Sequence, residues 1–562
     1  MSRIFKTKHF SHACLVLLAL QNTYAQTTPS AADVLRSIEQ YRPEQNKSPT
    51  KASATKMLAT KEKSQGVDKL RSVIVRSPLY AEKLSEFWRD EIGNSISSEK
   101  QNEFNAFAWE LFQRKGYLPY ITSKIDSSPT GSTLNIYVNF PRIREISITT
   151  TDDNNDSEFI NEVMHRFTAA YKSGMPVDVQ GFENQLSAAM YDLPVDLDVS
   201  LRQVNESELD VIIYLRSAEH IPGKILGGFL QSNNYGLSQF GPNQVLGNVR
   251  LAGFTPLSEL TLTTQLSHGI SYVRTDYELP IEGTNSRLRM YGSQMHSHAN
   301  DSIGRSQEMG AAVTKLLSTD RSGKWFGSAE LSNRTNQNWA ADVMHSDRVD
   351  NQLRFKIRLE SSNNWVDNFS NEVVLAVGEM DLGRLLSDKE ADASTSGLNV
   401  AGIYKKIEMT GSLSQSLDAK HIYTGYIRWR AQAASNNLDG YNRISLGGIN
   451  GIRAFSPLEG VGDQGAQMSF DIIHQVVPDV FGGLFYDVGV VKNNHHPLAN
   501  GTDTNAYLLQ GIGWQVGGKV NAFNWTLSVA HAFGKTPGLG VWTAANTQIG
   551  DFRADIAVTR PF

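Results

Sequence analysis

The sequence predicts a membrane β-barrel of about 16 antiparallel strands that carries two small N-terminal βααββ domains. Three observations support this fold class. The chain opens with a secretory-signal pattern, its first half repeats a unit of 75 residues, and its second half alternates in polarity. No later stretch reaches the roughly 20 apolar residues of a spanning helix. Only helices and closed barrels satisfy the backbone inside a bilayer, so the combination indicates a barrel.

Residues 1–25 have the pattern of a signal peptide. Arg3, Lys6 and Lys8 supply positive charge, Cys14–Leu20 is a short apolar core, and small residues surround a cleavage position after Ala25. The alternative is an anchor helix, for which this apolar run is too short. Cys14 is the only cysteine, so we expect neither disulfides nor thiolate metal sites in the mature chain.

Composition argues against several other function classes. Lys and Arg number 53 against 58 Asp and Glu, and no basic block occurs, so we expect no nucleic-acid partner. The pairs His495-His496 and His296-x-His298 fall in expected loops without carboxylates at ligand spacing, so we expect no metal. The sequence has no nucleophile elbow, zinc-protease motif or phosphate-binding loop, so we expect no catalytic residues and no cofactor.

The repeat defines two domains, which we place at residues 67–141 and 142–220. Shifting the chain by 75 residues superposes matching types at seven registers. Val73 falls on Ile148, Phe107 on Phe182, Leu111 on Leu186, Leu118-Pro119 on Leu193-Pro194, and Leu134, Ile136 and Val138 on Leu209, Val211 and Ile213. Each copy is predicted to run strand, helix, helix, strand, strand.

In the first copy the predicted strands are Leu70–Val75, Tyr117–Ile125 and Thr133–Phe140. In the last of them Leu134, Ile136, Val138 and Phe140 should point inward, and Asn135, Tyr137 and Asn139 outward. Leu84, Phe87, Trp88 and Ile92 predict one face of a first helix. A second helix begins near Ser98 with Gln101 in a capping box, carries the stripe Phe104, Phe107, Ala108, Leu111 and Phe112, and ends at Gly116.

In the second copy the predicted strands are Arg144–Thr149, Leu197–Gln203 and Leu209–Leu215. The two helix stripes contain Ile160, Val163, Met164 and Phe167, then Phe182, Leu186, Ala189 and Met190.

Residues 221–562 should form the barrel, with a strand pattern that begins near Gly223. Leu353, Phe355, Ile357 and Leu359 alternate with Arg354, Lys356, Arg358 and Glu360, and similar runs cover 273–279 and 373–377. One face suits lipid and the other a wet lumen. At about 10 residues per tilted strand, plus connections, this length accommodates 14 to 18 strands.

The final segment, Phe552–Phe562, alternates and ends on an aromatic residue. It resembles the signal that directs bacterial barrels to their assembly machinery, which would bind it through Phe562. Arg560 departs from that pattern, because the position is usually apolar, and its side chain could reach the membrane interface.

Several motifs resemble the two-partner secretion translocators, the TpsB family. Leu446-Gly447-Gly448 followed by Gly451-Ile452-Arg453-Ala454-Phe455 resembles that family's LGG…VRG(F/Y) signature, and Phe485-Tyr486-Asp487-Val488-Gly489 its F-x-D-x-G strand. Asn233–Gly236 resembles the first barrel strand, Tyr277–Pro280 a turn, and Ala32–Gln40 a plug helix. The βααββ modules resemble POTRA domains.

The resemblance implies a loop latch. The loop after Leu446 would fold back into the barrel, and Arg453 at its tip would pair with Asp487 through a bidentate fork. Gly447, Gly448 and Gly451 would permit the sharp path, Phe455 completes the loop signature, and Phe485 and Gly489 belong to the facing strand. The alternative is a purely structural ion pair. Ala454 departs from the family's glycine and leaves the pose of the tip open.

Residues 26–66 would be the plug helix and its linker. Val34, Leu35 and Ile38 form the narrow apolar stripe of the helix, which should suit a polar lumen. Because so short a helix is marginal in water, an unanchored N-terminal tail is the alternative.

The implied function is secretion of a large unfolded partner exoprotein of the TpsA type, a haemolysin, adhesin or contact-dependent toxin. It would pass from the periplasm, where the POTRA domains lie, through the outer membrane and its lipid, without nucleotide hydrolysis. POTRA edge strands could add a client strand, unless the domains are only rigid spacers. The other classes that remain open are an outer-membrane assembly factor, a passive pore and a barrel enzyme.

Overall fold

The structure is a computed structural model. It describes residues 30–40, 69–113, 117, 119–150, 195–205, 207–217, 221–255, 257–281, 284, 286–320, 323–363, 366–418, 420–497, 505–534 and 547–562. The predicted signal peptide, the linker, Gly116 and both helices of the second repeat lie outside the described residues. Among the described helices, none is long and apolar enough to cross a membrane.

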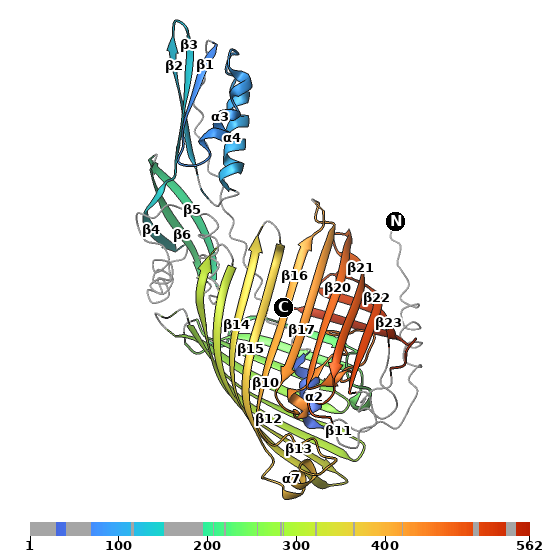
Figure 1. The fold of residues 1–562 in the computed structure, drawn as a ribbon. Helices are drawn as coiled ribbons and strands as arrows, with labels where there is room; N and C mark the ends of the chain where they lie inside the picture. The colour runs from blue at the N-terminus through green and yellow to red at the C-terminus, as the bar shows by residue number, and fades with distance from the viewer. Residues whose placement is uncertain are drawn as a thin grey trace, which may run out of the picture.

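The second half of the chain is a closed antiparallel barrel of 16 strands, which confirms the predicted fold class. The strands are β7 (Ile225–Asn233), β8 (Gln244–Ala252), β9 (Glu259–Ser267), β10 (Ile270–Ile281), β11 (Ser286–Ala299), β12 (Ser302–Asp320), β13 (Gly323–Ala340), β14 (Val343–Asn363), β15 (Val366–Asp381), β16 (Gly402–Ser416), β17 (Tyr423–Ala434), β20 (Gln464–Val477), β21 (Val480–Lys492), β22 (Ala506–Val520), β23 (Phe523–Gly534) and β24 (Phe552–Pro561). Strand β24 pairs with β7 and closes the barrel (Figure 1).

The alternation along the strands divides the barrel wall as predicted. Phe355 and Ile357 are 51% and 54% exposed on the outside. Arg354 lies between them and donates to Glu408 across the lumen-facing side at 2.8 Å. In β10, Val273 is exposed, whereas Arg274 and Asp276 are buried and bonded to each other. Apolar side chains thus meet lipid, and the charged ones pair inside.

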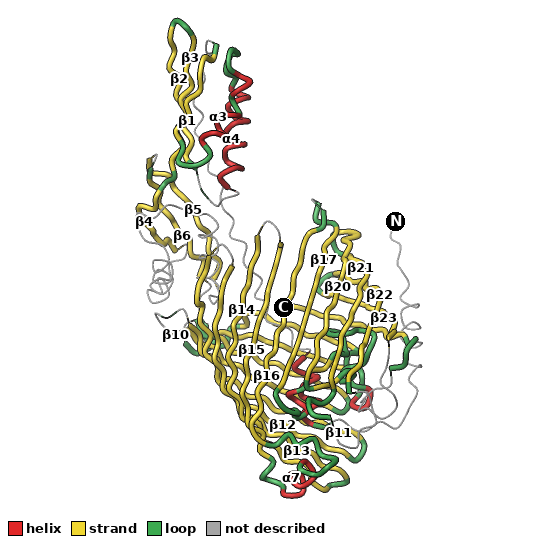
Figure 2. Tube along the Cα trace, viewed as in Figure 1, coloured by secondary structure: helices red, strands yellow, loops and turns green. Residues whose placement is uncertain are grey.

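The first repeat is a three-stranded sheet with helices beside it (Figures 1 and 2). Strand β3 (Gly131–Asn139) lies between β1 (Leu70–Arg76), which is parallel to it, and β2 (Tyr120–Ser128), which is antiparallel. The helices are α3 (Ala81–Glu86), the 3-10 turn η1 (Arg89–Glu91) and α4 (Ser98–Gln113). Leu84, Trp88, Phe104 and Phe112 form the core with the inward side chains of β3.

The second repeat reproduces that sheet. Strand β6 (Glu208–Ser217) lies between β4 (Arg142–Thr150), again parallel, and β5 (Val195–Asn205), again antiparallel. The strand order is repeated but the register is not: Val73 pairs with Leu134, whereas Ile148 pairs with Ile213, four residues beyond Leu209, the position that the 75-residue offset implies.

Two local predictions in the first repeat were wrong. The first helix ends at Glu86 and is followed by η1, so Ile92 is 53% exposed instead of facing the core. The cap of α4 is Ser97, whose Oγ accepts the Lys100 N–H at 3.1 Å, one residue before the predicted box. Asn135 faces outward as predicted but is nevertheless buried, because β3 is the central strand and its neighbours cover even the outer face, where Asn135 donates to Asp126.

Two motif placements in the barrel also need correction. Tyr277–Pro280 lies within β10, where it pairs with β11 up to Ile281, and is not a turn. His296 and His298 lie on β11 and not in a loop, although both are exposed as expected. Within the described ranges, no group of three or more potential ligands could hold a metal ion.

Helix α2 (Ala31–Gln40) lies inside the barrel (Figure 1). The barrel end at which β7 begins adjoins the repeat sheets, and the opposite end carries α7 (Leu386–Asp392) (Figure 1). After β17 the chain enters the lumen through the 3-10 turn η3 (Gly440–Asn442) and the short strands β18 (Ile444–Ser445) and β19 (Val461–Gly462). We call residues 446–460, between β18 and β19, the lumen loop.

Candidate functional site

The lumen loop follows a path that requires glycine. Gly448 has a φ of +103°, which L side chains rarely adopt. A Cβ at Gly447 would overlap the carbonyl oxygen of Ser456, and one at Gly451 would overlap that of Leu446. Gly447 and Gly451 thus stand where the backbone leaves no room for a side chain, and Gly448 where the backbone conformation disfavours one.

Arg453 at the loop tip contacts Asp487 on β21. Its Nε and Nη2 donate to the two carboxylate oxygens at 2.9 and 2.7 Å, and its backbone N–H donates to Oδ2 at 2.9 Å. The exposed fractions are 2% for Arg453 and 0% for Asp487. Three hydrogen bonds to one buried carboxylate hold the loop in a single pose.

Arg453 has a second carboxylate partner that sequence reasoning missed. Its Nη1 donates to Asp471 on β20 at 2.6 Å, and Asp471 also accepts from Gln515 at 3.1 Å. The only sequence signal for Asp471 is its lumen-facing place in the alternation of β20. The guanidinium is thus held by two strands, and although burial alone would lower the pKa of Arg453, the two carboxylates raise it above its ordinary value.

The aromatic residues of both motifs pack around this ion pair. The guanidinium carbon of Arg453 lies 3.5 Å from the ring centroid of Phe485, a cation–π arrangement. Phe455 is 1% exposed and joins Phe485 in one apolar cluster. A Cβ at Gly489 would lie 3.0 Å from Ile452 of the loop, so this glycine lets the loop approach β21.

Ala454, the departure from the family pattern, is accommodated by a glycine on β22, which pairs with Asp487 in the adjacent strand β21. It is fully buried. A Cβ at Gly511 of β22 would lie 2.8 Å from the Ala454 methyl group, closer than such atoms pack. The missing side chain at Gly511 therefore provides the space that the methyl group at Ala454 occupies.

The plug helix α2 is seated on an apolar patch of the lumen. Val34, Leu35 and Ile38 are at most 3% exposed. They pack with residues of the barrel wall and of the lumen loop, which we call the plug seat: Leu237, Phe240, Ile270, Tyr272, Met295, Ala299 and Leu458. The predicted stripe thus contacts an apolar surface, where sequence reasoning expected only a polar lumen.

Polar bonds fix both ends of the plug helix. The Ala31 N–H donates to Asn338 Oδ1 on β13 at 2.6 Å. Near the other end the bonds go to η3 and to β10: Arg36 donates to the Gly440 carbonyl, and Glu39 accepts from Tyr441 and also from Tyr272 and Arg274. The helix is therefore bound to the segment that leads into the lumen loop as well as to the wall.

A buried charge cluster lies behind this contact. Arg334 on β13 is 2% exposed and donates to Glu308 at 2.6 Å and to Asp350 at 3.3 Å. Its guanidinium carbon lies 3.1 Å from the ring centroid of Tyr441, which itself holds Glu39. The pattern of inward charges on long strands predicts such residues as a class but does not identify Arg334.

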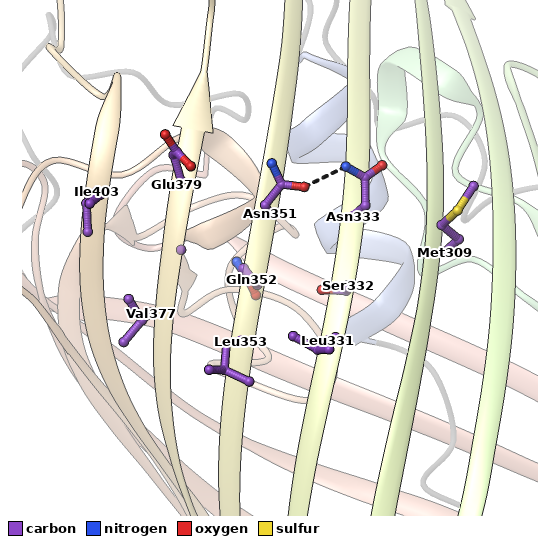
Figure 3. Close-up of a pocket in the computed structure, with 11 residues that line it drawn as sticks. Met309, Leu331, Ser332, Asn333, Asn351, Gln352, Leu353, Val377, Glu379 and Ile403 are labelled. Atoms are coloured by element: carbon purple, nitrogen blue, oxygen red, sulfur yellow. Dashed lines mark hydrogen bonds between the residues drawn. The ribbon is translucent and has the colours of Figure 1, made fainter.

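A groove of about 550 Å³ lies on the outside of the barrel, across β12 to β16 (Figure 3). Leu331, Leu353 and Val377 line its apolar part, and Asn333 donates to Asn351 at 2.7 Å beside them. Figure 3 shows these side chains on the outer face of the strands, with α2 behind the wall. The groove therefore faces the membrane and takes no part in the lumen site.

Comparisons with known proteins agree with this architecture. The chain resembles CdiB from Escherichia coli, with a TM-score of 0.60, 13% identity and coverage of 96% of this chain and 100% of that one. For CdiB from Acinetobacter baumannii the TM-score is 0.55 and the identity 15%, with coverage of 99% of this chain and 97% of that one. For BamA from Haemophilus ducreyi lacking POTRA domains 1–3 the TM-score is 0.50 and the identity 13%, with coverage of 89% of this chain and 100% of that one. At these identities the likeness shows the fold alone.

The sequence itself matches one family model. No curated protein sequence matches the chain. The model described as haemolysin secretion/activation protein ShlB/FhaC/HecB matches residues 221–517, which is more than half of the chain. The chain therefore belongs to the ShlB/FhaC/HecB haemolysin secretion/activation family, and it is an outer-membrane β-barrel transporter with its POTRA domains in the periplasm.

Proposed function

We propose that this transporter secretes one cognate exoprotein, a haemolysin, adhesin or contact-dependent toxin, from the periplasm to the cell surface. The client would pass unfolded through the barrel lumen. The observation that carries the proposal is the content of the lumen, where helix α2 and a folded-back loop occupy the path between the two ends of the barrel. Such contents suit a gated conduit, and they would serve no purpose in a passive pore.

In this proposal the POTRA domains receive the client. Among the described strands β2 pairs only with β3, and β5 only with β6, so each sheet presents an edge. An extended segment of the client could add there by backbone hydrogen bonds. The proposed boundaries are 67–141 and 142–220 for these domains, after a signal peptide at 1–25 and a plug and linker at 26–66, with the barrel at 221–562.

The proposed role of Arg453 and Asp487 is that of a latch for the lumen loop. The pair holds the loop in the closed lumen, and the loop with the plug helix must move before a client passes. The transporter would carry no catalytic group or cofactor, and folding of the client outside would supply the direction because it removes the unfolded form.

Deleting the gene tests the proposal. We expect one large protein to disappear from the culture medium or the cell surface, and a plasmid copy of the gene to restore it. The proposal is wrong if the secreted proteins are unchanged. Loss of many barrel proteins from the outer membrane would instead favour an assembly factor, the other function that this superfamily performs.

A further inference from the structure

Residues 456–459 of the lumen loop, which we call the loop arm, form a turn that is closed by one carboxylate. Glu459 Oε2 accepts the Ser456 N–H at 2.7 Å, and the Glu459 N–H donates back to the Ser456 carbonyl at 3.2 Å. Leu458 between them has a φ of +68°, a left-handed conformation that is uncommon for a residue with a large side chain. The turn therefore holds Leu458 in a pose that it would not adopt by itself.

The same turn is bonded to the segment that leads into β24. Glu459 Oε1 accepts the Thr547 N–H at 2.9 Å, and Arg553 Nη1 donates to Ser456 Oγ at 3.0 Å. Arg553 is held in turn by Asp555, at 2.9 Å. These bonds go to β24 and the segment before it, whereas Arg453 is bonded to β20 and β21, so the loop has two attachments on different strands.

Burial makes this attachment strong. Glu459 is 4% exposed, and a buried carboxylate is costly unless donors satisfy it. Both of its oxygens accept backbone N–H groups, one within the loop and one outside it. Losing the carboxylate would leave two buried donors unpaired, so the turn would be expected to open.

The residue that this turn presents belongs to the plug seat. Leu458 is 2% exposed and packs in the cluster that contains Val34, Leu35 and Ile38 of the plug helix. It comes from the lumen loop, whereas the other members of the seat come from the barrel wall and the loop after β7. The contact makes retention of the helix depend on the position of the loop arm.

We propose that Ser456 and Glu459 form a second anchor of the lumen loop, which positions Leu458 in the plug seat and thereby retains the plug helix in the lumen. The anchor acts on the helix from the β24 side, independently of the Arg453 pair. The proposal goes beyond export, since it concerns release of the helix in the absence of any client.

Thiol labelling of the purified full-length protein tests this anchor. In a Cys14→Ser background, Ala32→Cys places a thiol on the plug helix where the native side chain is 2% exposed. A bulky maleimide should react with it only when the helix leaves its seat. Glu459→Ala should raise the labelling rate about tenfold or more, because two buried backbone N–H donors lose their acceptor. Glu390→Ala removes an exposed carboxylate on α7 and is the matched control, expected to leave the rate unchanged.

A second reporter separates helix release from general loosening. Ala312→Cys places a thiol on β12, where the native residue is 3% exposed, and its labelling should not change in Glu459→Ala. Equal increases at both reporters, or no increase at Ala32→Cys, would overturn the proposal. If Glu459→Ala does not assemble, as judged by heat-modifiable migration in SDS gels, Ser456→Ala decides the question. It removes only the Arg553 contact and should raise the labelling rate about threefold or more, since one hydrogen bond is lost; an unchanged rate would refute the anchor.

Discussion

Replacing Asp487 by alanine should release the lumen loop. The change removes three hydrogen bonds, from the backbone N–H, Nε and Nη2 of Arg453, and leaves that guanidinium with Asp471 alone. Both members of the pair are at most 2% exposed, so solvent does not compensate for the loss. Breaking a buried ion pair on one side costs about 3–5 kcal/mol, which lowers the ratio of docked to free loop by more than about a hundredfold.

Two measurements on the same variants test this reasoning. The first is labelling of an Ala454→Cys thiol in a Cys14→Ser background, since Ala454 is fully buried while the loop is docked. The second is the amount of the exoprotein, identified by the deletion experiment, that reaches the medium. Asp487→Ala should increase labelling strongly and impair export while the barrel still assembles. Glu390→Ala should change neither quantity.

The two readouts distinguish a latch from a structural ion pair. Unchanged labelling would show that the pair does not hold the loop, and the energetic argument would be refuted. Increased labelling with normal export would leave the pair as a structural element, and the proposed latch role would be wrong.

Three further outcomes are expected. Gly451→Ala should loosen the lumen loop by about 1–3 kcal/mol, because its Cβ would overlap a carbonyl, whereas Gly292→Ala, which meets nothing closer than 3.8 Å, should be neutral in the same labelling assay. Asn234→Ala should lower the midpoint of heat modifiability, because the Asn234 amide bonds the backbone of β24 at 2.8 and 2.9 Å where the five-residue pairing with β7 ends. Burial raises the pKa of Glu459 to about 7 from 4.5, so the docked arm binds its proton more tightly than the released arm. Release of the plug helix should therefore increase by up to about a hundredfold as pH rises from about 5 to 8. The measurement is the labelling rate of Ala32→Cys, corrected for ionisation of the thiol. Glu459→Gln should lose this pH dependence.

Strand predictions succeeded where one periodicity decided the structure. The alternation in β14 places Phe355 toward lipid and Arg354 toward the lumen, because a period of two leaves no other choice. The first POTRA helix was misjudged because Phe87 and Trp88 suggest one continuous helical face. The chain instead turns at η1 and exposes Ile92. A pattern of apolar residues does not reveal where a short helix ends when no proline or glycine marks the point.

The lumen site was predicted only in part, for a different reason. Arg453 and Asp487 were identified by the motif resemblance, but Asp471 and Arg334 were not, because an inward charge on a strand has no signature that names its partner. The apolar seat of the plug helix was missed since Leu458 and the wall residues come from distant parts of the chain. Their convergence depends on the closed barrel, which local sequence patterns do not describe.

The burial of Arg453 has a consequence for ionic strength. At about 0.15 M salt the screening length is about 8 Å, and at 1 M it is about 3 Å, but mobile ions screen only charges that they can approach. Arg453 and Asp487 are covered by Phe455, Phe485 and the loop itself. Added salt should therefore leave the lumen loop in place. A competitor that displaces the pair would have to enter the lumen and supply hydrogen bonds of its own, as the proposed client could.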